Sequence, residues 1–165
     1  MNIFVVDKNP IAAARQLCNR HIVKMPLETA QMLCSALIAH GCEDAHYRAT
    51  HKSHPCTKWA GKTRNNFFWL VKHGLEMCRE YTRRYGKIHK CQEVIAHCNT
   101  LANHIPIGEQ TPFPQAMPKH FQDADTVQAY RNYYNGGKGY MNKGRGPQWK
   151  SDPPLWFNFC PVPKP

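Results

Sequence analysis

The sequence predicts a mainly α, compact single-domain helical fold with long ordered loops and an extended C-terminal tail. Several segments repeat apolar residues at helical spacing, and glycine or proline separates these segments. The 165 residues contain no internal repeat and no linker long enough to divide the chain, and 42% of them are hydrophobic, which suffices for one core. We therefore expect one domain over residues 1–165, with residues 150–165 as the tail.

The chain begins with a short apolar run and two closely spaced helices. Residues 2–6 are expected to be extended or strand-like. Asn9 is a good capping residue and Pro10 suits a first helical position, so a helix is predicted over residues 11–19. A second helix, over residues 18–39, follows directly.

The middle of the chain is predicted to alternate loops and helices. Residues 42–58 have no clear period and are expected to form a structured loop. One long helix is predicted over residues 59–85 and another over residues 91–104, with apolar residues on one face of each. Four prolines in residues 105–121 exclude a long helix there.

The last third is predicted to hold one short helix, a glycine-rich basic stretch and the tail. Asp123 or Asp125 is expected to cap a helix that runs through Tyr134. The tail is expected to pack three apolar side chains onto the body, namely Leu155, Trp156 and Phe157.

The charge of the chain indicates a polyanionic partner. Lysine and arginine number 22 against 11 acidic residues, for a net charge of +11, and ten histidines add charge below neutral pH. A charge this high in a small domain favours nucleic acid, with double-stranded DNA in first place, over an anionic membrane surface. We expect one α-helical nucleic-acid-binding domain, without membrane association and without an obligate protein partner.

The N-terminus and the cysteines predict a cytoplasmic protein. The first ten residues lack a basic region and a long apolar run, so they do not form a signal peptide. No segment was expected to reach the ~20 apolar residues of a membrane span. Eight cysteines without an export signal are expected to be reduced thiols. The location would be the host cell cytoplasm if a phage encodes the chain.

No cofactor or metal motif is strong. The chain has no Walker loop, no Gly-x-Gly-x-x-Gly after a strand and no Gly-x-Ser-x-Gly. His46, His51, His54 and Cys56 are zinc-ligand residue types, but their spacing matches no strong pattern. A structural zinc is the alternative to histidines that only form hydrogen bonds, and we expect neither a cofactor nor a metal.

The second predicted helix carries the best candidate site. At 100° per residue, one stripe presents an imidazole, an amine, a carboxylate, an amide and a hydroxyl, from His21, Lys24, Glu28, Gln31 and Ser35. The opposite side presents Val23, Leu27, Ala30, Cys34 and Leu37. The stripe is expected to line a cleft; the alternative is a plain amphipathic helix with an ordinary ion pair on its solvated face.

The stripe offers the groups that amine catalysis needs. A partly buried amine can attack a sugar C1′ or a carbonyl, and a neighbouring carboxylate or imidazole can then move protons. Pro26 lies within this helix, so the helix either starts near Met25 or continues through a kink. His21, Lys24 and Glu28 are the catalytic candidates, and Gln31 is expected to line the same pocket.

Two segments interleave cations with aromatic residues, which favours nucleic acid over a merely solubilising surface. They are YTRRYGKIHK at residues 81–90 and YRNYYNGGKGY at residues 130–140. Cations bind phosphates, and aromatic rings stack on exposed bases. The expected contacts to DNA are His54, Arg64, Asn65, Arg83, Arg84, Lys87, Tyr130 and Arg131.

Three segments resemble the phage endonuclease V type of pyrimidine-dimer DNA glycosylase/AP lyase. They are MNIFVVDKNPIAAARQLCNRHIVKMPLETAQML, NNFFWLVKHGLEMCREYTRRYGK and YRNYYNGGK, in this order along the chain. The resemblance covers about half of the chain. It implies a compact all-α domain that kinks DNA, extrudes a base and uses its free N-terminal amine to form a Schiff base at C1′.

The chain departs from that family at two positions. The resemblance implies a catalytic Glu two residues before the helix proline, but that position holds Lys24 and the nearest acid is Glu28. Asn2 is bulky enough to block removal of Met1, so the terminal amine would be that of Met1. The chemistry would then be altered, moved to Lys24 or lost.

Three functions follow as alternatives. The first is a DNA-binding, glycosylase/AP-lyase-like enzyme that acts on a damaged or modified base, with Met1, His21, Lys24 and Glu28 as catalytic candidates. The second is a non-catalytic nucleic-acid-binding phage accessory protein, which needs the basic surface but not the stripe. The third is an enzyme of nucleotides or modified bases, with the stripe as a base pocket.

Overall fold

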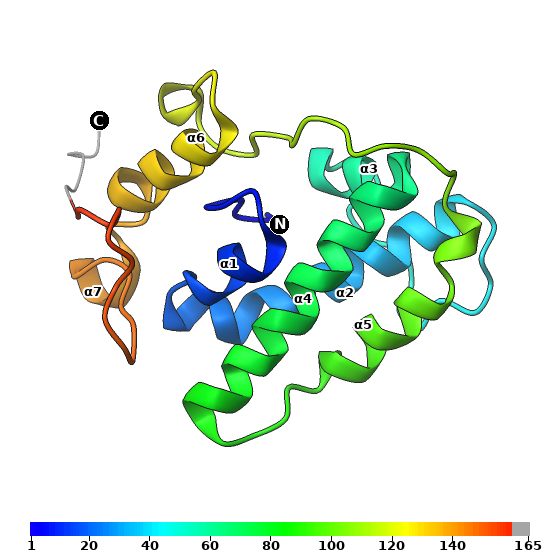
Figure 1. The fold of residues 1–165 in the computed structure, drawn as a ribbon, viewed down its shortest axis with the longest axis horizontal. Coiled ribbons are helices and arrows are strands. Elements are labelled where there is room, and N and C mark those ends of the chain that lie inside the picture. Colours follow the sequence, from blue (N-terminus) through cyan, green and yellow to red (C-terminus); the bar gives the residue numbers. More distant parts are fainter. Residues whose placement is uncertain (160–165) are drawn as a thin grey trace.

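A computed structural model describes residues 1–159, and these residues form a helical fold without strands (Figure 1). Short 3₁₀ turns cover Ala102–His104 and Lys119–Phe121, and a π-helical turn covers Tyr133–Gly137. The α-helices in chain order are α1 Pro10–Arg15, α2 Asn19–Ala39, α3 Pro55–Lys62, α4 Arg64–Tyr85, α5 Cys91–Thr100, α6 Thr126–Asn132 and α7 Met141–Gly144. The predicted mainly α fold is confirmed.

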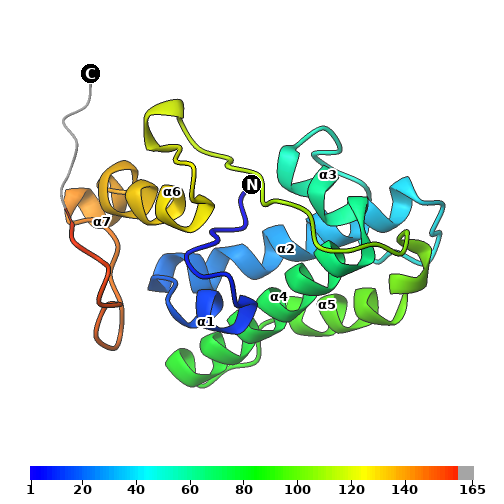
Figure 2. The ribbon, with the colours of Figure 1, turned by 45° about the horizontal axis from the view of Figure 1, so that its top comes forward.

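Helices α2 and α4 form the centre of the fold. They pack on each other, α3 and α5 pack on both, and α1 packs on α4. The irregular segment after α5 then crosses the molecule and leads to α6 and α7 at the far end (Figure 1). Figure 2 shows the N-terminal run between this crossing segment and α2. The crossing segment therefore closes over the start of the chain.

The first two helices follow local capping rules. The Asn9 side chain accepts hydrogen bonds from the backbone of Ile11 and Ala12, and Pro10 takes the first helical position. Helix α1 ends at Arg15, earlier than predicted. Helix α2 continues through Pro26, so the alternative in which it starts near Met25 is wrong. Because proline has no backbone N–H, the carbonyl of Ile22, four residues before Pro26, lacks its usual helical hydrogen bond.

The helix predicted over residues 59–85 is in fact two helices, which corrects that prediction. Thr63 has an extended backbone, with φ −142°, and its side chain caps α4 by accepting from the backbone of Asn66. Helix α3 begins at Pro55, inside the segment predicted as loop. Gly86 ends α4 in the left-handed conformation, with φ +66°, as its sequence position predicts.

The apolar face of helix α2 is buried in its second half and exposed near its start. Ala30, Cys34 and Leu37 are buried as expected, whereas Val23 and Leu27 are 47% and 42% exposed. Ser35, which belongs to the polar stripe, is buried. Its hydroxyl donates to the carbonyl of Thr50 and accepts from the backbone N–H of Thr50. The two ends of the helix therefore bury different faces.

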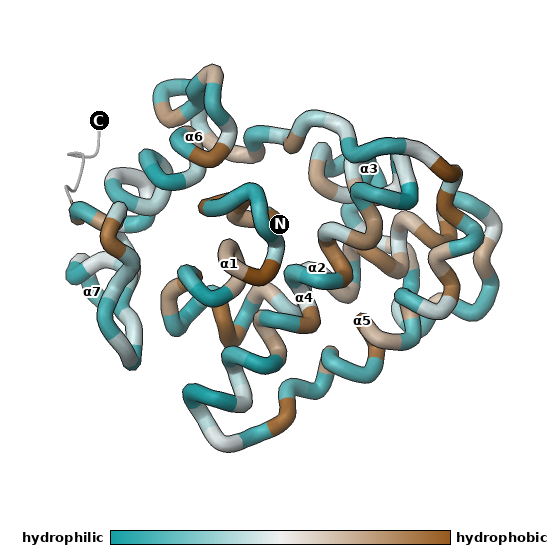
Figure 3. Tube along the Cα trace, viewed as in Figure 1, coloured by the Kyte–Doolittle hydropathy of each residue, from teal (hydrophilic) through white to brown (hydrophobic). Residues whose placement is uncertain are grey.

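Apolar stretches in Figure 3 occur in the N-terminal run and along the central helices. Within residues 1–159, α2 is the one helix whose length and composition would suffice to cross a membrane, which corrects the expectation that no segment reaches that length. Most of its apolar window is buried against the other helices, and a core helix has the same composition.

The described part of the tail is anchored by tryptophan. Trp156 packs against the hydrophobic core and lies edge-on to Tyr134 at 5.7 Å between ring centroids. Leu155 is fully exposed, so the prediction that it packs onto the body is wrong. Seven cysteines of the described residues are free thiols, as expected. The eighth cysteine and the end of the predicted tail lie outside the described residues.

Candidate active site

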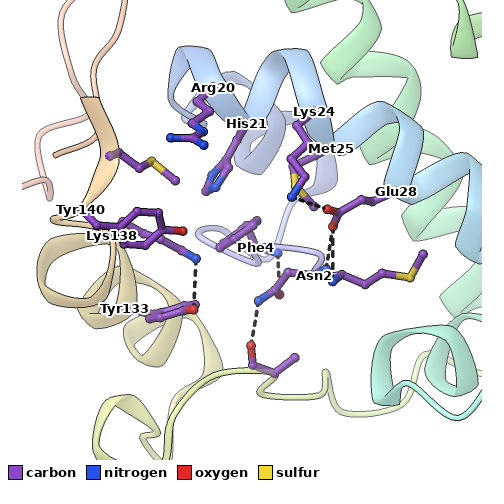
Figure 4. A pocket seen from close by; sticks show the side chains of 13 residues that line it. Asn2, Phe4, Arg20, His21, Lys24, Met25, Glu28, Tyr133, Lys138 and Tyr140 are labelled. Carbon is purple, nitrogen blue, oxygen red and sulfur yellow. Dashed lines mark hydrogen bonds and ion pairs between the residues drawn. The ribbon is translucent and has the colours of Figure 1, made fainter. Parts of the chain in front are cut away.

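A cavity of about 230 Å³ lies where α2, the N-terminal run and the segment after α6 meet. Figure 4 shows its wall at close range. The helix contributes Arg20, His21, Lys24, Met25 and Glu28; the N-terminal run contributes Met1, Asn2 and Phe4; the C-terminal segment contributes Tyr133, Lys138, Tyr140 and Met141, and the crossing segment contributes Ala116. The predicted polar stripe therefore does line a pocket along its first two turns.

The carboxylate of Glu28 gathers three nitrogen atoms at one end of this pocket. Its Oε2 lies 3.7 Å from the Met1 amine and accepts a hydrogen bond of 3.1 Å from the backbone N–H of Asn2. Its Oε1 lies 3.1 Å from Lys24 Nζ. An acid thus stands beside two amines. This arrangement can hold an amine in place and take up or return its proton.

The N-terminal run is fixed so that the Met1 amine lies beside Glu28 in the pocket. The side chain of Asn2 donates a 2.7 Å hydrogen bond to the carbonyl of Ala116 and accepts a 2.8 Å bond from the backbone of Ile3. Phe4 has φ +41°, a left-handed conformation that costs a non-glycine residue about 1–3 kcal/mol. Asn2 and Phe4 thus turn the chain end toward Glu28.

His21 forms a neutral part of the pocket wall. Its ring stacks on Phe4 at 4.0 Å between centroids, and its Nδ1 forms a hydrogen bond with Tyr134 Oη. Burial lowers the pKa of His21 well below its usual value, and the nearby charges of Lys138 and Lys24 lower it further. The imidazole is therefore uncharged near neutral pH.

A second amine lies at the other end of the pocket. Lys138 is 7% exposed, and its Nζ donates a 3.0 Å hydrogen bond to Tyr133 Oη. The ammonium also lies over two rings, 4.2 Å from the centroid of Tyr133 and 5.1 Å from that of Phe4. Burial lowers the pKa of Lys138.

The structure brings together the four predicted catalytic residues, Met1, His21, Lys24 and Glu28, in one pocket. None of the nine predicted substrate-binding residues (Gln31 and the eight expected DNA contacts) lines this pocket. Tyr130 is fully buried and donates a 2.8 Å hydrogen bond to the carbonyl of Pro114, so it cannot stack on a base. Arg84 is also withdrawn from the surface, because its guanidinium binds the carbonyls of Leu17 and Arg15 near the end of α1. These two predictions are wrong.

Several other predicted contacts have structural partners. Arg64 donates to the carbonyls of Asn103 and Ile105, and Asn65 to Glu109. Arg83 pairs with Glu76 and Glu80. The side chain of His54 caps α3 by accepting from the backbone of Cys56. Arg131 donates to the carbonyl of Val6. Their roles in binding DNA stay predictions, as does that of Lys87. Gln31 was expected in the pocket of the catalytic residues, but it does not line that pocket.

Sequence reasoning missed Arg20, Phe4, Lys138 and Tyr140 as pocket residues. Lys138 and Tyr140 lie in the aromatic glycine-rich segment, which was singled out but not connected to the helix stripe. Within residues 1–159, no group of three or more His, Cys, Asp or Glu side chains is placed to hold a metal ion. His46, His51, His54 and Cys56 thus do not form a zinc site there.

Neither a curated protein nor a solved structure matches the chain. The model of one family, described as pyrimidine dimer DNA glycosylase, matches residues 1–93, which include the N-terminal run and the whole of α2. That description names an enzyme that removes bases in DNA repair. Since the match covers more than half of its length, the chain belongs to the pyrimidine dimer DNA glycosylase family.

Proposed function

We propose that the protein is a DNA glycosylase with AP-lyase activity, and that it removes a damaged or modified base from double-stranded DNA with the Met1 amine as nucleophile. The observation that carries this proposal is the convergence of the Met1 amine and Lys24 Nζ on the carboxylate of Glu28. Family membership supports the choice of DNA as substrate. The net charge of +11 supports binding to the phosphate backbone.

Glu28 compensates for the departure of the sequence from the resembled pattern. The expected acid position, two residues before Pro26, is Lys24, and Glu28 lies one helical turn further along the same face. Its carboxylate reaches the Met1 amine from there. In this proposal the catalytic acid lies one helical turn after the position that the resemblance implies. Lys24 Nζ contacts Oε1 of this carboxylate, and the Met1 amine lies near Oε2.

The reaction proceeds in two stages. The lone pair of the Met1 amine attacks C1′, the bond from C1′ to the base breaks, and the base leaves with that electron pair and takes up a proton. Glu28 accepts the proton that the attacking nitrogen loses and returns it to O4′ as the sugar ring opens, which leaves a Schiff base at C1′. The Glu28 carboxylate then takes the C2′ proton, and the bond from C3′ to the phosphate oxygen breaks as the phosphate leaves with its electron pair. Water then hydrolyses the Schiff base and frees the Met1 amine.

Borohydride trapping tests this proposal. The protein is mixed with a duplex that carries one abasic site, and the expected result is a covalent adduct that survives denaturation. Glu28→Gln is expected to lower the trapping rate about 10²-fold or more, because proton transfer contributes about that much. Lys72→Ala, an exposed lysine of α4 outside the pocket, is the matched control.

Tryptic digestion of the adduct distinguishes the two amines. A label on Met1 appears on the peptide of residues 1–8, whereas a label on Lys24 blocks cleavage there and appears on residues 21–48. The proposal predicts the first pattern. A label on Lys24 would assign the nucleophile to that residue, and binding of DNA without any adduct would favour the non-catalytic alternative.

A further inference from the structure

Two free thiols touch at the interface of α2 and α5. Cys34 of α2 and Cys98 of α5 are both fully buried, and their Sγ atoms lie 3.6 Å apart. The two helices pack on each other and on α4 in the centre of the fold (Figure 1). The cysteines are 64 residues apart in the sequence, so folding brings them together.

A covalent bond between these sulfurs needs only a small movement. The sulfurs of a disulfide lie about 2.05 Å apart, so the two Sγ atoms would have to approach by about 1.5 Å. Rotation of one side chain about its Cα–Cβ bond moves its sulfur over a distance of this size. The contact in the reduced protein therefore already places the pair for an intramolecular disulfide.

The loop between α2 and α3 lies against this pair and is held by a few hydrogen bonds. The hydroxyl of Ser35 in α2 bonds to the carbonyl and the N–H of Thr50, at 2.8 and 2.9 Å. His97 of α5 donates a 3.2 Å hydrogen bond to the carbonyl of Asp44. Loops open locally at a lower free energy than packed helices, so opening of this loop admits a small solute to the thiols.

The surroundings of the two thiols make them chemically unequal. The hydrogen bond with Cys98 lowers the pKa of Cys34, and the backbone N–H groups of Tyr47 and His46 lower it further, although burial acts against them. The same hydrogen bond, together with burial, raises the pKa of Cys98. Since the thiolate is the nucleophilic form of cysteine, Cys34 is the sulfur that reacts first with an oxidant.

We propose that Cys34 and Cys98 form an oxidation site, at which hydrogen peroxide converts the two thiols into a reversible disulfide between α2 and α5. The Cys34 thiolate attacks one peroxide oxygen and becomes a sulfenic acid, while the O–O bond breaks and the departing hydroxide takes up a proton to form water. The Cys98 sulfur then attacks the Cys34 sulfur, the S–O bond breaks, and the departing hydroxide leaves as water with the Cys98 proton. The two sulfurs together lose two electrons, which the peroxide gains.

The disulfide would link the second half of α2 to α5, and the first half of α2 carries Glu28 and lines the active-site pocket. A link between residues far apart in the sequence restricts the unfolded chain. Oxidation should therefore raise the midpoint of thermal unfolding by about 4–16 °C. This inference does not depend on the proposed function, because it requires neither DNA nor the Met1 amine.

Peptide mapping of the folded full-length protein tests the inference. The protein is treated with hydrogen peroxide at neutral pH, its unreacted thiols are alkylated, and it is digested with trypsin without reductant. The expected product joins the peptide of residues 25–48 to that of residues 91–119, and dithiothreitol separates the two. The midpoint of thermal unfolding should rise on oxidation and return to its starting value after reduction.

Matched variants assign the link, because each peptide contains a second cysteine. These are Cys42 in the first peptide and Cys91 in the second. The variant with both Cys42→Ala and Cys91→Ala should keep the link, whereas Cys98→Ala should abolish it and leave a sulfenic acid on Cys34 that dimedone labels. The double variant retains only Cys34 and Cys98 in the two peptides, so it decides the assignment even if Cys98→Ala does not fold.

Three results would overturn the inference. The first is the absence of the link at a peroxide concentration that oxidises glutathione at the same pH. The second is loss of the link in the folded double variant, since the bond would then belong to Cys42 or Cys91. The third is a sulfinic acid on Cys34 in place of the link, which would show that Cys98 does not reach it. A failure of borohydride trapping would overturn the proposed function and leave this test unaffected.

Discussion

Two groups of cations in this molecule look alike in the sequence and differ in the structure. At the end of α4, the guanidinium groups of Arg15, Arg79 and Arg83 converge on Glu76, at 2.8, 3.1 and 2.7 Å from its carboxylate oxygens. Glu76 is only 1% exposed. Around the pocket, Lys24 pairs with Glu28, while Lys138 donates to the phenol of Tyr133 and lies over that ring.

The difference shows that a run of basic residues does not define a binding surface. Glu76 and Glu80 neutralise part of the charge of the arginines around them, and these arginines tie α1 to α4. The pocket cations come from segments more than a hundred residues apart, so their grouping is invisible in any one window. Four predictions test this contrast, beginning with the change that should cost the most stability.

The largest effect is expected for Glu76→Gln, which removes the shared acid of the arginine cluster. We expect the free energy of unfolding to fall by about 2–4 kcal/mol, because the substitution weakens three charge-assisted hydrogen bonds to a buried carboxylate. The arginines can still be hydrated after the substitution, which limits the loss. Urea unfolding at neutral pH measures it. A loss below about 0.5 kcal/mol would mean that the cluster contributes little to stability.

The same residue predicts the acid sensitivity of the fold. Burial by itself would raise the pKa of Glu76, but hydrogen bonds from Arg15, Arg83 and Arg79 outweigh it and lower the pKa from 4.5 to about 2. Since the folded pKa is depressed, its stabilisation is fully present above the unfolded pKa and is lost as the pH falls toward 2. Glu76→Gln should therefore show a shallower loss of stability than the wild type over this interval.

An intermediate effect is expected for Tyr134→Phe, behind the pocket wall. The phenol oxygen accepts a 3.3 Å hydrogen bond from the backbone of Cys18 and bonds to His21, both in the buried interior. Leaving these groups without a partner should cost about 1–3 kcal/mol in the free energy of unfolding. Thermal unfolding measures the loss. An unchanged midpoint would show that His21 is held by its stacking on Phe4 alone.

The smallest effect is expected for single arginines that would contact DNA under the proposed function. Arg20 lines the pocket, whereas Arg83 is paired with Glu76 and Glu80. Arg20→Ala should reduce the slope of log affinity against log salt concentration by the equivalent of about one phosphate contact. Arg83→Ala should reduce this slope by less. Fluorescence anisotropy with a labelled duplex at several salt concentrations gives both slopes. A larger effect for Arg83→Ala would reverse the contrast between the two groups.

Local signals in the sequence predicted most of the fold. The capping of α1 by Asn9 and Pro10, the end of α4 at Gly86 and the break of helical structure by the prolines of residues 105–121 depend on neighbouring residues alone. The break at Thr63 was missed because Trp59 and Phe67, on either side of it, lie eight residues apart, a spacing that also places them on one face of a single helix. Thr63 is a capping residue, and capping preferences are weak beside such a pattern.

The candidate site was predicted only on its helical side. Spacing along α2 placed His21, Lys24 and Glu28 on one face, and the first two turns of that face do line the pocket. Spacing could not show that Tyr130 is buried or that Arg84 binds the carbonyls at the end of α1, since both depend on segments far away in sequence. A tyrosine or an arginine can contact DNA or be bonded within the protein, so the residue type alone did not decide between the two roles.

The helical class, the polar stripe of α2 and the high positive charge follow from local periodicity and composition, so they can be derived from the amino-acid sequence. The contact of Met1 with Glu28 and the position of Lys138 at the other end of the pocket become visible in the folded chain alone. These contacts join residues that are far apart in the sequence, which no local pattern reports. They form when Asn2 bonds to Ala116 and Phe4 packs between His21 and Tyr133.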